Sequence, residues 1–95
     1  MKDIIIPVDF SETSLNAARY AADMFSGKSD THVMLYHMFK GEDDGATAVQ
    51  YLDSLKSEME QKGVNDIEII TEMGDDLIDS LGRLAYQKTA ELIIM

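Results

Sequence analysis

The chain has 95 residues, of which 45% are apolar, so it fits one small domain and is not a disordered tail. It contains no cysteine, which excludes disulfides, thiolate metal sites and thiol chemistry and makes a reducing cytoplasm the expected compartment. Its 18 acidic and 8 basic residues give a net charge of −10, and a field of this sign repels nucleic acid and anionic membrane surfaces.

The N-terminal residues predict a strand followed by a helix. Residues 4–8, IIIPV, form a short apolar run rich in β-branched side chains, which predicts a strand that ends next to Asp9. A second pattern, apolar residues at helical spacing, predicts a helix whose buried side carries Leu15, Ala18, Ala22 and Phe25. We expect Ser11 to be the N-cap of this helix and Gly27 to stop it.

The middle of the chain repeats this alternation. Residues 33–39 are again apolar and predict the second strand. Residues 39–46, FKGEDDGA, predict a solvated polar loop rather than a calcium site, because they lack the ligand spacing of a calcium-binding loop. An apolar stripe from Ala48 to Met59 then predicts a second helix.

The last third of the chain predicts one more strand, one more helix and a final strand. Residues 67–73 form the strand, and residues 77–85 carry the helical stripe. Gly82 lies inside that helix, where we expect it to allow close packing. Residues 92–95 are apolar throughout and predict the final strand.

The order β-α-β-α-β-α-β predicts an α/β fold of three layers with an open parallel sheet. Residues 4–8 and 92–95 are typical of central strands buried on both faces, whereas 67–73 carries the charges of an edge strand. We therefore expect the strand order 3-2-1-4. Open α/β sheets bind ligands beyond the carboxyl ends of the strands, where the order reverses, and Asp9 lies beside that crevice.

The final apolar run stops at Met95, the last residue of the chain. A central type of strand left at an edge exposes unpaired backbone. We therefore expect residues 1–95 to be a single truncated domain, and we expect the exposed edge to favour a homo-oligomer.

Three segments, taken in order, resemble the universal stress proteins. They are PVDFSETSLNAARYAADM at 7–24, HVMLYHM at 32–38 and GDDLIDSLGRLAYQKTAELIIM at 74–95. The resemblance implies a Rossmann-like, adenine nucleotide alpha-hydrolase-like fold with five strands ordered 3-2-1-4-5, of which the fifth is missing here. It also implies that a glycine-rich loop, which cradles phosphate with backbone amides, would follow the fourth strand.

The resemblance implies five nucleotide-binding positions, which are Pro7, Val8, Asp9, Met38 and Met95. The residues around Asp9 would meet the adenosine, and Met95 would stand beside the phosphate loop. The ligand implied for the full-length parent is ATP, with Mg²⁺. Because the phosphate loop is missing, residues 1–95 alone are expected to bind ATP weakly or not at all.

Asp9 has two readings from the residues themselves. It could accept hydrogen bonds from a ligand, or it could cap the following helix with Glu12 completing a capping-box spacing. We favour the ligand role because of the crevice. His32 and His37 flank one strand without further metal-ligand residues at the right spacing, which predicts ordinary hydrogen bonds rather than a metal site.

These observations predict a nucleotide-binding module of a stress response, one that binds or switches rather than catalyses. No residues suggest a nucleophile oriented by a general base, so any ATP hydrolysis by the parent would depend on elements after Met95. The alternative is a stress protein that binds no nucleotide and acts through dimerisation or partner docking.

Overall fold

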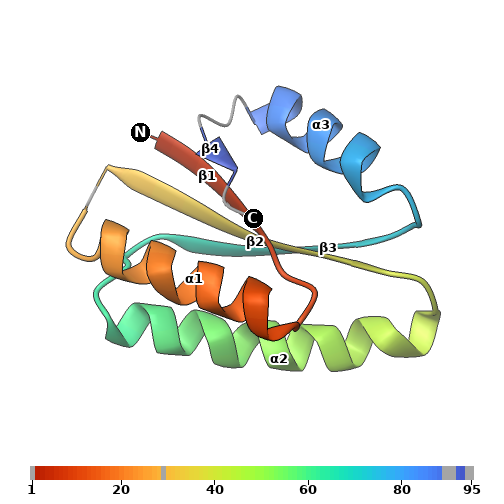
Figure 1. Ribbon diagram of the computed structural model, residues 1–95, viewed down its shortest axis with the longest axis horizontal. Coiled ribbons are helices and arrows are strands. Elements are labelled where there is room, and N and C mark those ends of the chain that lie inside the picture. The colour runs from red at the N-terminus through yellow and green to blue at the C-terminus, as the bar shows by residue number, and fades with distance from the viewer. Residues whose placement is uncertain (1, 29, 89–91, 94–95) are drawn as a thin grey trace.

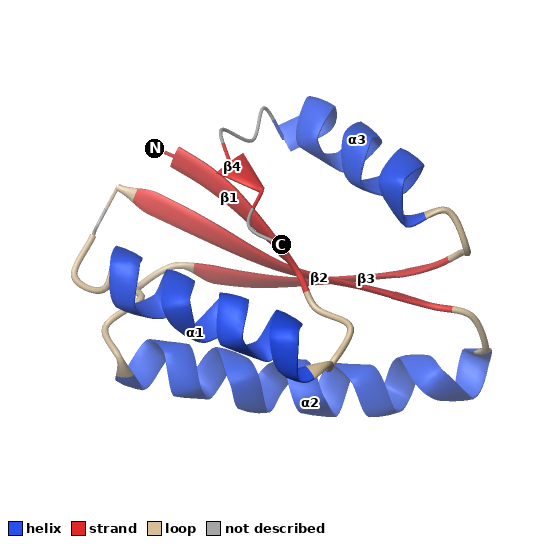
Figure 2. Ribbon diagram, in the orientation of Figure 1, coloured by secondary structure: helices blue, strands red, loops and turns tan. Residues whose placement is uncertain are grey.

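The computed structural model describes residues 2–28, 30–88 and 92–93, which form a four-stranded parallel sheet with three helices (Figures 1 and 2). In chain order the elements are β1 (Lys2–Pro7), α1 (Glu12–Phe25), β2 (Thr31–Phe39), α2 (Glu42–Gln61), β3 (Ile67–Met73), α3 (Leu77–Lys88) and β4 (Leu92–Ile93). The strand order is β3-β2-β1-β4, which confirms the predicted α/β fold and its order 3-2-1-4.

Helices cover both faces of the sheet, as Figure 1 shows. Ile4 and Ile6 of β1 point toward α1 and α2 and belong to one buried cluster. Ile5 points the other way and packs with Tyr36 of β2 and Leu81 of α3 in a second cluster. Because each face of β1 meets a helical layer, every residue from Ile4 to Ile6 is buried, which explains the unbroken apolar run.

The two outer strands differ in character. β3 is an edge strand, as its charged residues predict, and Glu68 and Glu72 remain partly exposed on it. β4 pairs with β1 through the registers Ile4↔Leu92 and Ile5↔Ile93. The remainder of the predicted fourth strand, residues 94–95, lies outside the described residues.

The polar loop predicted over 39–46 is wrong in its extent, because α2 begins at Glu42. Gly41 has an extended backbone and serves as the N-cap of α2. Gly45 suits the helix for a packing reason. A Cβ atom at this position would lie 3.0 Å from Cζ of Phe39, so glycine makes room for that ring.

Gly82 does not have the packing role that we expected. A Cβ atom there would meet nothing within 4 Å, and the residue is exposed on the outer side of α3. The predicted helix stop at Gly27 is confirmed, since Gly27 follows α1 with a φ of 76°, and Gly63 likewise follows α2 with a φ of 101°. These positive values are strained for residues with a side chain, which explains glycine at both ends.

Candidate functional site

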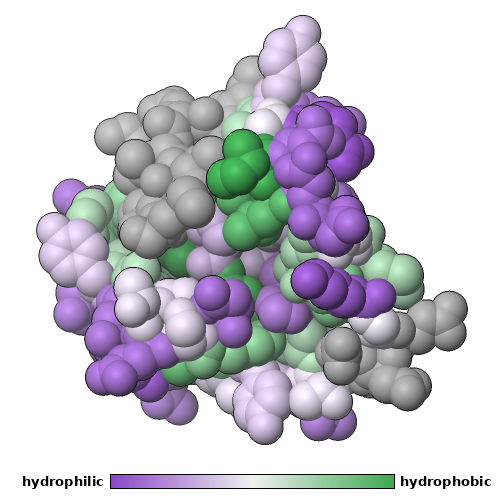
Figure 3. Space-filling model, turned by 45° about the vertical axis from the view of Figure 1, so that its right-hand side comes forward, coloured by the Kyte–Doolittle hydropathy of each residue, from purple (hydrophilic) through white to green (hydrophobic). Residues whose placement is uncertain are grey.

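A cavity of about 410 Å³ lies beyond the carboxyl ends of β1, β2 and β3. Its volume falls within the range of about 300–1,000 Å³ that is typical of small-ligand sites. Apolar walls come from Pro7, Val8, Tyr36, Met38 and Leu77. Polar groups at the cavity come from Asp9, Ser11, Thr13, Ser14, Lys40 and Asp75. Figure 3, with this side turned forward, shows hydrophobic surface set among hydrophilic residues.

The cavity brings together four of the five residues predicted from the resemblance, namely Pro7, Val8, Asp9 and Met38. The fifth, Met95, lies outside the described residues. The described lining is formed by β1, β2, the segments that follow these two strands, and the segment that follows β3. Three lining residues were not predicted, namely Tyr36, Lys40 and Leu77. Tyr36 lies toward the carboxyl end of β2, Lys40 follows β2, and Leu77 begins α3, so all three lie at this edge of the sheet.

The carboxylate of Asp9 is hydrogen-bonded within the tight turn between β1 and α1. Its Oδ1 accepts the backbone N–H of Ser11 at 2.9 Å, and the backbone N–H of Asp9 donates to Oγ of Ser14 at 3.2 Å. The N-cap of α1 is Ser11, whose Oγ accepts the backbone N–H of Ser14 at 3.2 Å. The prediction of Ser11 as N-cap is therefore confirmed, and the reading of Asp9 as the cap itself is wrong because Asp9 lies two residues earlier.

The same hydrogen bonds keep Asp9 charged. Hydrogen bonds hold the pKa of Asp9 below its ordinary value. The largest contribution comes from the Ser11 side chain, followed by the Ser11 backbone and then the Ser14 side chain. Asp9 is exposed at the cavity, so its carboxylate retains lone pairs that no protein group occupies. The turn thus presents an ionised hydrogen-bond acceptor to anything that enters the cavity.

Phe10 has an unusual backbone conformation, with a φ of 64°, in the left-handed region that non-glycine residues rarely adopt. Its ring lies against His37, at 4.7 Å between centroids, and against Tyr51, at 5.5 Å. His37 in turn holds the end of β1, because its Nδ1 lies 2.6 Å from the carbonyl oxygen of Val8 and must donate to it. Sequence analysis missed Phe10, since a lone phenylalanine carries no signal for a left-handed backbone.

The far wall of the cavity depends on Gly74. Its backbone N–H donates to the carbonyl of Phe39 at 3.0 Å, which joins the segment after β3 to the end of β2. A Cβ atom at Gly74 would lie 3.3 Å from Cε of Met38, so glycine permits the close approach of Met38. Met38 can therefore line the cavity while it touches this loop.

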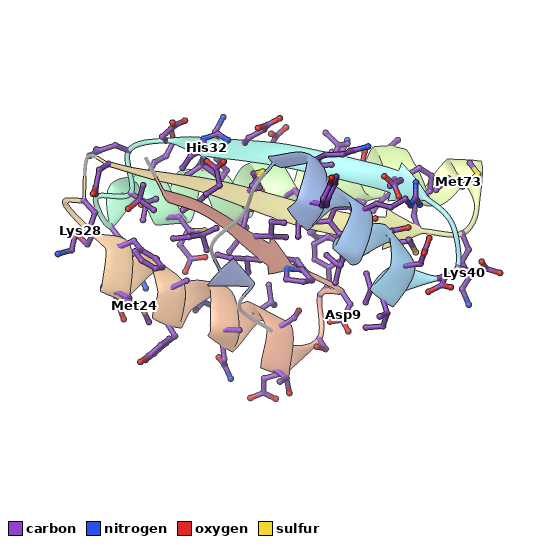
Figure 4. The ribbon with its side chains drawn as sticks, turned by 90° about the horizontal axis from the view of Figure 1, so that it is seen from above. Asp9, Met24, Lys28, His32, Lys40 and Met73 are labelled. Atoms are coloured by element: carbon purple, nitrogen blue, oxygen red, sulfur yellow. The ribbon has the colours of Figure 1, made fainter. Side chains whose placement is uncertain are left out.

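The remaining polar candidates have structural roles. His32 lies near the opposite end of the sheet (Figure 4) and bridges Asp66, at 3.0 Å from Nδ1, and Glu68, at 2.9 Å from Nε2. Burial lowers the pKa of His32, but hydrogen bonds to Glu68 and Asp66 outweigh burial and raise it above 6.5. Asp76 caps α3, since its Oδ1 accepts the backbone N–H of Asp79 at 3.0 Å.

Among the side chains that the structure describes, no group of three or more His, Asp or Glu could hold a metal ion. None of the helices described is long and apolar enough to cross a membrane.

Comparisons with known proteins agree with this fold. The sequence model of the universal stress protein family matches residues 1–95. No curated protein sequence gives a significant match. Among solved structures, the protein Rv1636 from Mycobacterium tuberculosis H37Rv is 22% identical with a TM-score of 0.81, over 98% of this chain and 68% of that chain.

Two further solved structures give similar values. A universal stress protein in complex with cAMP is 22% identical with a TM-score of 0.80, over 97% of this chain and 69% of that chain. The hypothetical protein MJ0577 is 22% identical with a TM-score of 0.80, over 99% of this chain and 73% of that chain. Likenesses at this level of identity establish the shared fold.

Proposed function

Because the chain belongs to the universal stress protein family, we propose that it is an adenine-nucleotide-binding module of a stress response. The observation that carries the proposal is the cavity of about 410 Å³ around which Pro7, Val8, Asp9 and Met38 gather. Further support comes from a solved neighbour of the same fold, the universal stress protein in complex with cAMP. The lack of cysteine supports a cytoplasmic location.

The cavity has the chemistry that a nucleoside needs. Apolar side chains of Val8, Met38 and Leu77 offer surfaces on which a flat base can pack. Asp9 is ionised and exposed, so it can accept hydrogen bonds from ribose hydroxyls. The α1 turn holds this carboxylate in place through Ser11 and Ser14, which reduces the entropy lost on binding.

The family resemblance assigns the phosphates and Mg²⁺ of ATP to a glycine-rich loop that follows the fourth strand. The described residues fit the nucleoside part better, since the cavity offers apolar walls and Asp9 but has Lys40 as its single cation. We therefore propose that residues 1–95 bind adenosine, and that they bind ATP weakly or not at all. A chain that also carries this loop would bind ATP with Mg²⁺, and binding rather than catalysis would be its role.

Isothermal titration calorimetry of the chain with adenosine, ATP and cAMP tests this proposal. Asp9→Asn keeps the size of the side chain and removes its charge, and we expect adenosine affinity to fall about tenfold, the effect of weakening one hydrogen bond to a charged group. Asp30→Asn is the matched control, because Asp30 is also exposed but does not line the cavity. The proposal is wrong if no adenine compound binds, or if Asp9→Asn and Asp30→Asn bind adenosine equally.

The alternative function, dimerisation or partner docking without a nucleotide, has one observation in its favour. β4 is an edge of the sheet, and among the described strands it pairs with β1 alone. We propose that this edge mediates homo-oligomerisation in either case. Sedimentation velocity over a range of concentrations would show it, and a monomer at the highest concentration would contradict it.

A further inference from the structure

The outer face of α3 carries apolar side chains that the fold leaves in solvent. Ile78 is 71% exposed and Tyr86 is 87% exposed, the two largest values among the exposed large apolar residues of the described chain. They stand four residues on either side of Gly82, so all three share one side of the helix. The sheet is contacted by another side of α3, which contributes Leu81 and Leu84 to a buried cluster. We call Ile78, Gly82 and Tyr86 the outer stripe of α3.

Among the described residues, nothing requires glycine at position 82. A Cβ atom there would meet nothing within 4 Å, although glycine inside a helix costs about 1 kcal/mol relative to alanine. The missing side chain leaves a gap between the two exposed apolar residues of the stripe. A groove of about 490 Å³ is lined by Ile78, Asp79, Gly82, Arg83, Tyr86 and Gln87. A second helix can approach closely at such a gap, because the distance between packed helices depends on the side chains at the contact.

Acidic groups border this groove. Asp76 and Asp79 are exposed at the start of α3, and Glu72 is partly exposed on β3. Arg83 lies among these acids, with its Nε 3.2 Å from Oδ2 of Asp79 and its Nη2 3.8 Å from Oε1 of Glu72. One guanidinium is thus set among three carboxylates, in a chain whose net charge is −10. This border favours lysine or arginine on a partner that covers the groove.

We propose that the outer stripe of α3 is a docking surface for an amphipathic helix of another protein, one that carries lysine or arginine beside its apolar residues. Apolar residues of that helix cover Ile78 and Tyr86, and one of them enters the gap at Gly82. Its basic residues lie beside Asp76 and Asp79. A second copy of this chain fits less well, because it would bring its own acids to the same contact.

This docking surface is separate from the nucleotide cavity. The described residues that line the groove and those that line the cavity have no member in common. Figure 1 shows α3 on one side of the sheet, with α1 and α2 on the other. The inference therefore goes beyond the proposed function and does not depend on nucleotide binding.

Two synthetic peptides serve as probes. Each has about 18 residues, enough for a stable helix, with leucine along one face. The opposite face carries lysine in one peptide and glutamate in the other. Fluorescence anisotropy of the labelled peptides measures their binding to the chain. We expect the lysine peptide to bind at least about tenfold more tightly than the glutamate peptide, and its affinity to fall as salt is raised.

Two pairs of variants locate the binding site. Tyr86→Ala removes an apolar side chain of the stripe, and Tyr20→Ala is its control, because Tyr20 is an exposed tyrosine of α1 on the other side of the sheet. Gly82→Gln fills the gap with a polar side chain, and Gly82→Ala is its control, because alanine adds a single carbon. Both substitutions at Gly82 favour the helix, so neither should unfold the chain.

We expect Tyr86→Ala and Gly82→Gln to weaken binding of the lysine peptide about tenfold. Tyr20→Ala should bind as wild type does, and Gly82→Ala should lose less affinity than Gly82→Gln. Circular dichroism confirms that each variant is folded. The proposal is overturned if neither peptide binds, if both bind equally, or if Tyr86→Ala and Tyr20→Ala have the same effect.

Sedimentation velocity without peptide tests a second copy as the occupant. We expect Tyr86→Ala and wild type to have the same oligomeric state. If wild type associates and Tyr86→Ala is a monomer, the stripe binds another copy of this chain, and the assignment to a basic partner is wrong.

Discussion

Phe10 offers a test of the backbone that shapes the cavity entrance. Its φ of 64° is left-handed, which costs a residue with a side chain about 1–2 kcal/mol and costs glycine nothing. Phe10→Ala and Phe10→Gly both remove the ring that contacts His37 and Tyr51, so their difference isolates the backbone. Glycine loses about 0.5–1 kcal/mol more entropy than alanine on folding. We therefore expect the glycine variant to be more stable by about 0.5–1 kcal/mol.

Urea unfolding followed by far-ultraviolet circular dichroism measures this difference through the midpoints and slopes of the transitions. Gly82→Ala is the control, because Gly82 is inside a right-handed helix and has open space around it. There alanine should be the more stable residue, by about 1 kcal/mol. The preference thus reverses between the two sites. If alanine is as stable as glycine at position 10 while Gly82→Ala stabilises as expected, the left-handed backbone carries no cost and the reasoning fails.

Three further predictions concern the sheet and the cavity. Because the pKa of His32 is raised in the folded state, its contribution to stability is full below about pH 6.5 and is lost as pH rises through the folded pKa. In urea unfolding, the free-energy advantage of wild type over His32→Gln should therefore shrink from about pH 6 to about pH 9. A difference that stays constant with pH would contradict this prediction. Gly74→Ala should push Met38 into the cavity and weaken adenosine binding with little change in thermal midpoint, and unchanged affinity would show that Met38 moves elsewhere. Leu52→Ala, at a fully buried position, should lower the free energy of unfolding by about 2–5 kcal/mol, and a loss below about 1 kcal/mol would mean that the core closes over the gap.

The strand order was predictable because its cause is local to each strand. Three isoleucines in succession, Ile4 to Ile6, predict that β1 is buried on both faces. Glu68 and Glu72 predict that β3 is an edge strand. The start of α2 was not predictable in the same way. Residues 42–45 have the composition of a loop, yet they begin a helix in which Gly45 leaves room for the Phe39 ring.

The cavity was predictable only in part. Asp9 follows an apolar strand directly, so its position at the carboxyl edge can be read from its neighbours in the chain. Lys40 and Asp75 are 35 residues apart, and their proximity depends on the hydrogen bond between Phe39 and Gly74. Nothing in a single sequence reports such a tertiary bond. The same holds for the left-handed turn at Phe10, which is stabilised by rings from two other elements.

The two edges of the sheet differ in a way that bears on the proposed homo-oligomer. Along β3, Glu68 and Glu72 would bring like charges together if a second chain paired there, so this side resists contact. Contact through β4 alone joins two copies by the same surface, and a twofold axis then uses up that surface in both. If the proposed contact through β4 forms, we expect the assembly to end at two chains. A sheet that paired along both edges would add copies without limit, and we expect the charges on β3 to prevent this.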